Sequence, residues 1–558
     1  MRRGADSVAL MRRTVWLALA LAGLLATPAH AQRLTVRTPA LKASLSIRAD
    51  FAARATTVRV RGHARVRRRA TLMLVRCADR RCGRGARRQR VVRRLSRRVR
   101  LTLRVKPARF AQLELRSGRR LLRRVRLRAP FRDAAVVPAP VPSSSAVSTD
   151  PPLTPAYDPA VPDYTVACEP GRSVRVTVGS DVRTIPLRGG QAFSIGSHRV
   201  RCLPREWAGF TVTRTGTPQS EWIVFNTAGF TVIVDSYGVP VWWKAGAGPL
   251  VDGRVLPDGT VAVGRRSETA FDRYPYAHFA LDGTPLPDID AVGTRIDNHD
   301  FEVLPNGNLL LMAYVPREHV DLTAIGGPAD APVVDGLLQE VTPDRQVVWS
   351  WRSSDHVAVG ETTFPIDQIK LPDGDRSVYD LVHLNSLQAD GDGVIISARH
   401  LDAVLRIRRS DGGIDWKLGG TSTSQSLDFA GDFGGQHMAR RLPDGTLTLH
   451  DNGSRKGRPP RALRLALDPV ARTARIVERV TDPRVASSFC CGGATRLAGG
   501  HWLMSWGGTP VITELAADGA PVLTLRLGAG FSYRAYPVSS SLLSRAALRA
   551  GMDAMAPR

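Results

Sequence analysis

Three histidines share one position relative to three similar turns. His299, His383 and His437 each lie eight residues before the glycine of an Asn-Gly or Asp-Gly turn. The chain contains 12 histidines, so chance is a poor explanation for three in one register. We expect them to occupy equivalent positions of a repeated unit. Imidazole can bind a metal ion or act as a nucleophile, and the neighbouring residues decide between these chemistries.

Two further polar residues lie near the second histidine. Asn385 follows His383 by two residues, so alternation along a strand should place both side chains on one face. Arg399 lies across the next turn, on the strand that returns beside His383. Its planar fork of donors suits oxyanions, and its charge disfavours a bound cation. The set therefore predicts a site for a tetrahedral anion that a neutral histidine can attack, with no metal and no cofactor.

The same residues also have structural interpretations. His299 and His383 could form hydrogen bonds between repeated units, and Arg399 could pair with Asp300 or Asp402. A metal-dependent hydrolase is another alternative, but it needs carboxylate ligands. The histidine register carries no acid in any repeat, which counts against that class of enzyme.

A repeated turn motif organises the part of the chain that carries these residues, from about residue 220 to 537. Asp-Gly, Asn-Gly or Gly-Gly separates two apolar runs, as in "VLPDGTVAVG" at 255–264 and "LPDGTLTLHDNG" at 442–453, which is a strong hairpin signal. A second turn leads into a strand that often contains Trp, as in "TPDRQVVWSW" at 342–351. Such units, repeated radially, are propeller blades. The strand entering each hairpin should be innermost, so the three histidines should converge on the central channel.

The complete chain is predicted to be all-β, a six-bladed β-propeller (220–537) preceded by two small β-sandwich-like domains. Residues 33–133 alternate Val or Leu with Arg, which is typical of half-buried strands. Residues 134–160 form a Pro/Ala/Ser linker, and residues 161–218 form the second small domain. A C-terminal tail spans residues 538–558.

The positive charge is concentrated in the first of these domains. Residues 33–133 carry 34 Lys and Arg but only 4 Asp and Glu, in a chain with a net charge of +29. One interpretation is an anchor for an anionic cell-envelope polymer. The alternative is a solvated face of charged strands. Nucleic acid is not expected as a partner, because no aromatic residues interleave the arginines to stack on bases.

The first 31 residues have the pattern of a signal peptide. "MRRGADSVALMRR" is positively charged, "TVWLALALAGLLA" is apolar, and Ala29–Ala31 is an A-x-A cleavage site. We therefore expect an exported protein, located outside the cell or in the cell envelope. Export permits disulfides.

The six cysteines fall into three local pairs. We expect disulfides between Cys77 and Cys82 and between Cys168 and Cys202, with free thiols as the alternative. The adjacent Cys490 and Cys491 are either a vicinal disulfide or two free thiols. No cysteine or histidine spacing is typical of zinc.

The middle of the repeat region resembles a known family. "NHDFEVLPNGNLLLMAY", "DLVHLNSLQADGDGVIISARHLDAVLRI" and "GGQHMARRLPDGTLTLHDNG" are similar to the signatures of bacterial arylsulfate sulfotransferases. The resemblance implies an exported six-bladed propeller that needs no nucleotide sulfate donor. It implies transfer of a sulfuryl group from a phenolic sulfate ester to a phenolic acceptor, by a ping-pong route through a sulfohistidine.

The resemblance also implies a role for each candidate residue. His437 would be the nucleophile, and His383, Asn385 and Arg399 would hold the sulfuryl oxygens. His299 would hold the anion or exchange a proton with the phenolic oxygen. The alternative function is a non-catalytic propeller that binds a cell-wall polymer or a partner protein.

Overall fold

The computed structural model describes residues 147–557 except 170–172, 267–273 and 374, and strands β1–β9 within residues 32–137. These residues belong to two units, which divide between residues 135 and 136. The predicted signal peptide lies outside the described residues. The predicted pairing of Cys77 with Cys82 does too, because Cys82 is not described.

The first unit contains two antiparallel sheets of four strands each. The first sheet consists of β1 (Gln32–Thr38), β2 (Leu41–Phe51), β3 (Thr56–Val66) and β6 (Arg98–Val105). The second consists of β5 (Arg90–Arg94), β4 (Ala70–Cys77), β7 (Phe110–Ser117) and β8 (Arg120–Arg128). Val60 of the first sheet is fully buried, as are Leu74, Leu113 and Leu115 of the second. Apolar side chains at alternate positions therefore form the core of this unit.

The second unit begins with two small sheets. One consists of β10 (Val147–Asp150), β12 (Ser173–Val178) and β13 (Asp181–Pro186). The other consists of β11 (Asp163–Ala167), β15 (His198–Leu203), β14 (Ala192–Ile195) and β9 (Val136–Val137). The Cys168–Cys202 disulfide is present, as predicted. The segment expected to be a linker contains β9 and β10. Their backbones pair with β14 and β12, respectively, so these parts of the segment belong to the two sheets.

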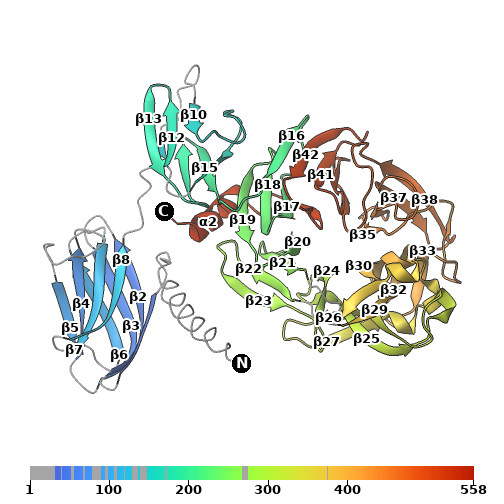
Figure 1. The fold of residues 1–558 in the computed structure, drawn as a ribbon, viewed down its shortest axis with the longest axis horizontal. Helices are drawn as coiled ribbons and strands as arrows, with labels where there is room; N and C mark the ends of the chain where they lie inside the picture. Colours follow the sequence, from blue (N-terminus) through green and yellow to red (C-terminus); the bar gives the residue numbers. More distant parts are fainter. Residues whose placement is uncertain are drawn as a thin grey trace, which may run out of the picture. The chain divides into compact units, whose positions relative to one another are not determined.

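Six further sheets follow one another around a ring (Figure 1), which confirms the β-propeller. The first sheet contains β17 (Trp222–Thr227), β18 (Phe230–Asp235), β19 (Pro240–Ala245) and β43 (Ala535–Val538). The second contains β20 (Leu250–Val255), β21 (Val261–Arg265), β22 (Tyr276–Phe279) and β23 (Pro285–Ile289). The third contains β24 (Ile296–Val303), β25 (Leu309–Val320), β26 (Ala331–Val341), β27 (Val347–Arg352), β28 (Lys370–Asp373) and β29 (Arg376–Asp380).

The remaining three sheets complete the ring. The fourth sheet contains β30 (Leu384–Asp390), β31 (Gly393–Ala398), β32 (Ala403–Arg408) and β33 (Ile414–Gly419). The fifth contains β35 (His437–Arg441), β36 (Leu447–Asp451), β37 (Arg461–Asp468), β38 (Thr473–Val480) and β34 (Asp428–Phe429). The sixth contains β39 (Gly493–Arg496), β40 (Trp502–Ser505), β41 (Val511–Leu515), β42 (Pro521–Leu527) and β16 (Phe210–Arg214). The innermost strands β43, β20, β24, β30, β35 and β39 contact one another in a closed cycle.

The turn glycines explain why the repeat is visible in the sequence. Gly259, Gly307 and Gly445 have φ values of 80°, 84° and 81°, a left-handed conformation that favours glycine. Each donates its N–H to the carbonyl of the leucine three residues earlier. The same turn therefore follows the innermost strand of the second, third and fifth sheets, and distances counted from it compare equivalent residues.

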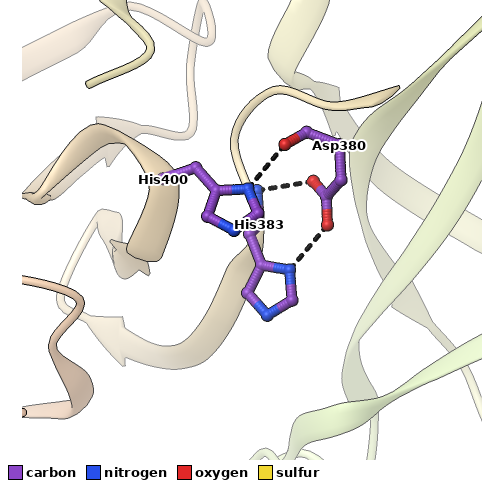
Figure 2. A group of neighbouring side chains, drawn as sticks. All are labelled: Asp380, His383 and His400. Carbon is purple, nitrogen blue, oxygen red and sulfur yellow. Dashed lines mark hydrogen bonds and ion pairs between the residues drawn. The ribbon is translucent and has the colours of Figure 1, made fainter. Parts of the chain in front are cut away.

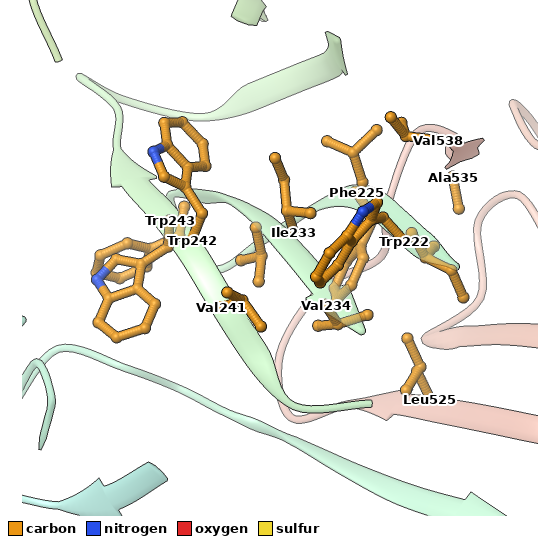
Figure 3. Packing of buried hydrophobic residues seen from close by; sticks show 14 of the residues in the cluster. Trp222, Phe225, Ile233, Val234, Val241, Trp242, Trp243, Leu525, Ala535 and Val538 are labelled. Carbon is orange, nitrogen blue, oxygen red and sulfur yellow. The ribbon is translucent and has the colours of Figure 1, made fainter. Parts of the chain in front are cut away.

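Both ends of the repeat region close the ring. Strand β43 pairs with β17, and strand β16 pairs with β42. Buried Trp222, Phe225 and Val538 pack at this closure (Figure 3). The segment expected to be a tail contains helix α2 (Arg545–Met555), which packs on β19 through Met552. Among the described residues, no helix combines the length and apolarity needed to cross a membrane.

Candidate active site

The three register histidines lie on three successive innermost strands. His299 is part of β24, His383 directly precedes β30, and His437 is the first residue of β35. The ring centroids of His299 and His383 are 4.8 Å apart. The Arg399 amide donates to the His383 carbonyl, and burial and the Arg399 guanidinium lower the pKa of His437. The structure therefore brings His299, His383, His437 and Arg399 into one region of the ring.

A buried carboxylate holds each of the first two histidines. The Nδ1 atom of His299 lies 2.6 Å from Oδ1 of Asp297. The Nδ1 atom of His383 lies 2.6 Å from Oδ2 of Asp380, whose other oxygen accepts the His383 amide at 2.8 Å (Figure 2). Such contacts fix the ring and stabilise positive charge on it when the other nitrogen meets a proton or an anion.

The backbone at His383 differs from the expected strand. Its φ is 52°, and the pairing of β30 with β31 is irregular between Leu384 and Ser386. Simple alternation therefore does not relate Asn385 to His383. Asn385 is fully buried, and its Nδ2 donates to the carbonyl of Gln436 at 2.7 Å. This bond ties the fourth sheet to the residue that precedes His437.

Arg399 stands opposite His383, at the end of β31. Its amide donates to the His383 carbonyl at 2.9 Å. Its guanidinium donates to Nε2 of His400 at 2.9 Å and to the Phe489 carbonyl at 3.2 Å. Burial lowers the pKa of Arg399, although Asp380 and Asp402 oppose the shift, and arginine keeps its charge in proteins.

The ion pairs proposed from the sequence for Arg399 do not form. Asp300 instead pairs with Arg254, Arg440 and Arg534. Asp402 pairs with Arg455 and, less closely, with Lys456.

Asp380, His383 and His400 bring ligand-type atoms within 4.8 Å of one another. These atoms are already engaged in a hydrogen-bond network (Figure 2). The Nδ1 atom of His400 donates to the Asp380 carbonyl at 2.5 Å, which leaves Nε2 to accept from the Arg399 guanidinium. Burial and the neighbouring His383 hold the pKa of His400 well below its ordinary value. A cation at His400 would face the arginine charge, so this donor set suits an anion better than a metal ion.

His437 is buried and differs from the other two histidines in its partners. Its Nδ1 faces two acceptors, Oδ1 of Asn452 at 2.8 Å and the Gly435 carbonyl at 3.0 Å. Its Nε2 faces a donor, the amide of Cys491, at 3.1 Å. The proton therefore resides on Nδ1 and the lone pair on Nε2. Burial, followed by the charge of Arg399, holds the pKa of His437 well below its ordinary value, so the ring is neutral at neutral pH.

Sequence reasoning missed several residues that organise the site. Arg534 is fully buried and donates to the His299 carbonyl at 3.0 Å and to the Asn385 carbonyl. Asp300 accepts hydrogen bonds from Arg254 and Arg440 and forms an ion pair with Arg534. Burial alone would raise the pKa of Asp300, but these charges hold it below its ordinary value.

One signal for these residues was present in the sequence. An acid precedes His299 by two residues and His383 by three, and these acids are Asp297 and Asp380. The corresponding residues before His437 are not acidic. No comparable signal marks Arg534 or Asn452.

Comparison with known proteins agrees with the predicted resemblance. Residues 275–528 match the family model for arylsulfotransferase (ASST). No curated protein matches the chain. Similar solved structures include a protein of unknown function from Bacteroides caccae (12% identity, 57% of this chain and 99% of that chain, TM-score 0.37) and the Cps50 (Swd1) β-propeller domain of Myceliophteria thermophila (12%, 59% and 89%, 0.27). A third is Kluyveromyces lactis Hsv2, with 10% identity over 65% of this chain and 93% of that chain and a TM-score of 0.29.

Proposed function

From the arylsulfotransferase family, to which residues 275–528 belong, we propose that this protein moves a sulfuryl group from a phenolic sulfate ester to a phenolic acceptor through a sulfohistidine at His437. The observation that carries the proposal is the state of the His437 ring. It is buried and neutral, with its proton held at Nδ1 and its lone pair on Nε2. These are the properties that a nitrogen nucleophile needs.

In the first half-reaction, Nε2 of His437 attacks the sulfur atom of the donor. The N–S bond forms while the bond between sulfur and the aryl oxygen breaks. The electron pair of the broken bond goes to the phenolic oxygen, which takes a proton from Nε2 of His299. Asp297 supports the charged form of His299 before this transfer, through its contact with Nδ1.

In the second half-reaction, the acceptor phenol gives its proton back to His299 and attacks the same sulfur atom. The N–S bond breaks, and its electron pair returns to Nε2 of His437. The two half-reactions return His437 and His299 to their starting states and consume only the donor and the acceptor, as a ping-pong transfer requires.

His383, Asn385 and Arg399 hold the sulfuryl oxygens in both steps. Arg399 supplies permanent charge in a buried setting, where an electrostatic contact is worth more than in water. His383 is oriented by Asp380. The second amide hydrogen of Asn385 remains for the anion, because Nδ2 has two hydrogens and one bonds to Gln436.

The location and the Arg-rich unit extend the proposal. We place the protein outside the cell or in the cell envelope, on the basis of residues 1–31, and the Cys168–Cys202 disulfide is compatible with export. The arginines of residues 33–133 would bind an anionic envelope polymer. At low salt, an immobilised polyanion should retain the wild type but not a variant that lacks residues 33–133. The variant should still transfer the sulfuryl group to a small phenol. Unchanged retention would exclude this unit as the anchor.

The test of the function is turnover of a chromogenic aryl sulfate with added phenol. The wild type should release the coloured phenol and accumulate a labile SO3 adduct on His437, detected by mass spectrometry of the donor-treated protein. His437→Ala should do neither. A wild type that does not turn over the donor would leave the non-catalytic binding propeller as the better explanation. A variant that equals an active wild type would exclude His437 as the nucleophile.

A further inference from the structure

The two adjacent cysteines lie directly against the proposed nucleophile. Cys490 and Cys491 form a vicinal disulfide in the segment that leads into β39. The Cys491 amide donates to Nε2 of His437 at 3.1 Å. This nitrogen is the one that must attack sulfur, and the reaction described above gives the disulfide no task.

The peptide between the cysteines is held in an uncommon position. Cys491 has a φ of 60°, which residues with side chains rarely adopt. The peptide lies on Gly507, where a Cβ atom would be 1.9 Å from the Cys490 carbonyl oxygen and 2.3 Å from the Cys491 carbonyl carbon. A side chain at Gly507 would therefore displace the peptide, and this close approach keeps the Cys491 amide at the ring.

The side-chain carboxamide of Asn452 bridges the His437 ring and Cys491. Asn452 accepts from Nδ1 of His437 through Oδ1, and its Nδ2 donates to the Cys491 carbonyl at 3.0 Å. The Cys491 amide then returns to Nε2 of the same ring. His437, Asn452 and Cys491 thus form a closed cycle of hydrogen bonds, in which a shift of the cysteine backbone must disturb both ring nitrogens.

The same segment also reaches the anion-holding side of the site. The Phe489 carbonyl accepts from the Arg399 guanidinium at 3.2 Å. Phe489 is 66% exposed, and Cys490 is half-buried, so a small dithiol can reach the disulfide from solvent.

We propose that the Cys490–Cys491 disulfide positions the Cys491 amide as a donor at the reacting atoms, an inference that rests on the proposed function. Before reaction, the Cys491 amide donates a hydrogen bond to the lone pair of Nε2. When Nε2 bonds to sulfur, that lone pair is consumed, and the buried amide turns to an oxygen of the new sulfuryl group because an unpaired buried N–H is costly. Closing a ring through the Cys490–Cys491 peptide restricts the rotations that would move this donor away.

The experiment compares oxidised protein with protein reduced by dithiothreitol, which supplies the two electrons that convert the disulfide to two thiols. Single-turnover transfer from an aryl sulfate to His437 should slow at least tenfold on reduction and recover on reoxidation. A Cys168→Ala/Cys202→Ala variant, which lacks the other described disulfide, should respond like the wild type. Cys490→Ala/Cys491→Ala should be slow already and insensitive to dithiothreitol, with an unchanged thermal midpoint.

A second readout does not depend on sulfuryl transfer. Diethyl pyrocarbonate modifies unprotonated imidazole nitrogen, and peptide mass spectrometry reports its rate at His437. Loss of the amide contact should speed this modification while transfer slows, a pair of opposite changes that general damage to the fold would not produce. Wild-type transfer by the double variant, or an equal modification rate in both redox states, would overturn the inference. If the oxidised wild type shows no transfer, the proposed function fails, and the modification rate still decides whether the disulfide positions the amide.

Discussion

The Oδ1 atom of Asn452 lies 2.8 Å from Nδ1 of His437, where His299 and His383 have carboxylates instead. A carboxylate favours positive charge on an imidazole, whereas a carboxamide only orients the ring. The three histidines of one register are therefore divided by their partners. Two are suited to contact an anion or carry a proton, and one is suited to remain neutral and attack.

Replacing Asn452 by aspartate should alter the protonation of the nucleophile. In the wild type, the acid limb of kcat/KM should lie below the ordinary histidine pKa, because the pKa of His437 is lowered and the neutral ring reacts. Asn452→Asp places a carboxylate at Nδ1, which raises that pKa and should move the acid limb to higher pH. The pH–rate profile measures the shift.

The matched control is Asn306→Asp. Asn306 is exposed in a turn whose equivalent in the fifth sheet carries Asp444, so its profile should coincide with that of the wild type. If Asn452→Asp keeps the wild-type acid limb, the contact does not set the protonation of His437.

Arg399→Lys tests whether the site needs a planar fork of donors. Lysine keeps the charge but cannot reach His400, the Phe489 carbonyl and an anion in one geometry. We expect kcat to fall about 100-fold, the usual scale for losing one preorganised donor. Arg455→Lys is the control, because Arg455 also lies over the Phe364 ring but pairs with Asp402. Equal rates for the two variants would contradict a direct role for Arg399.

Acid should destabilise the propeller through its buried histidines. Burial lowers the pKa of His450 from 6.5 to about 4. Between these values the unfolded chain binds a proton that the folded chain does not, so the stability present above pH 6.5 is lost as the pH falls towards 4. This histidine alone accounts for roughly 3 kcal/mol over that window.

Urea unfolding at several pH values checks this expectation. His450→Leu should show a weaker loss of stability on acidification than the wild type. His319→Asn changes a histidine whose side chain is 85% exposed, and it should keep the wild-type pH dependence. Parallel curves for all three proteins would refute the assignment to His450.

Asp300→Asn should weaken the centre of the propeller. Asp300 is fully buried and neutralises Arg254, Arg440 and Arg534. Removing its charge leaves the buried guanidinium of Arg534 without its carboxylate partner, although Arg254 keeps its contact with Asp252. Breaking a buried pair in this way typically costs about 3–5 kcal/mol. The free energy of unfolding in urea measures the loss. Asp392→Asn breaks the contact of an exposed aspartate with Arg406, and its urea midpoint should not change.

The arrangement of strands could be predicted because its signals are local. The Asp-Gly and Asn-Gly turns place glycine where φ is positive, and apolar runs on both sides identify the hairpin. Counting back from the turn then brought His299, His383 and His437 into one register. Where the backbone departs from a regular strand, as at His383, local reasoning failed for the neighbouring Asn385.

The sequence by itself determined the β-propeller, the histidine register and the family resemblance, because turn chemistry and alternation act over a few neighbouring residues. Only the tertiary structure decided which partner each histidine receives. Cys491 is 54 residues from His437, and Arg534 is 235 residues from His299. Ring closure brings such residues together at the channel, and no spacing along the chain encodes their contact.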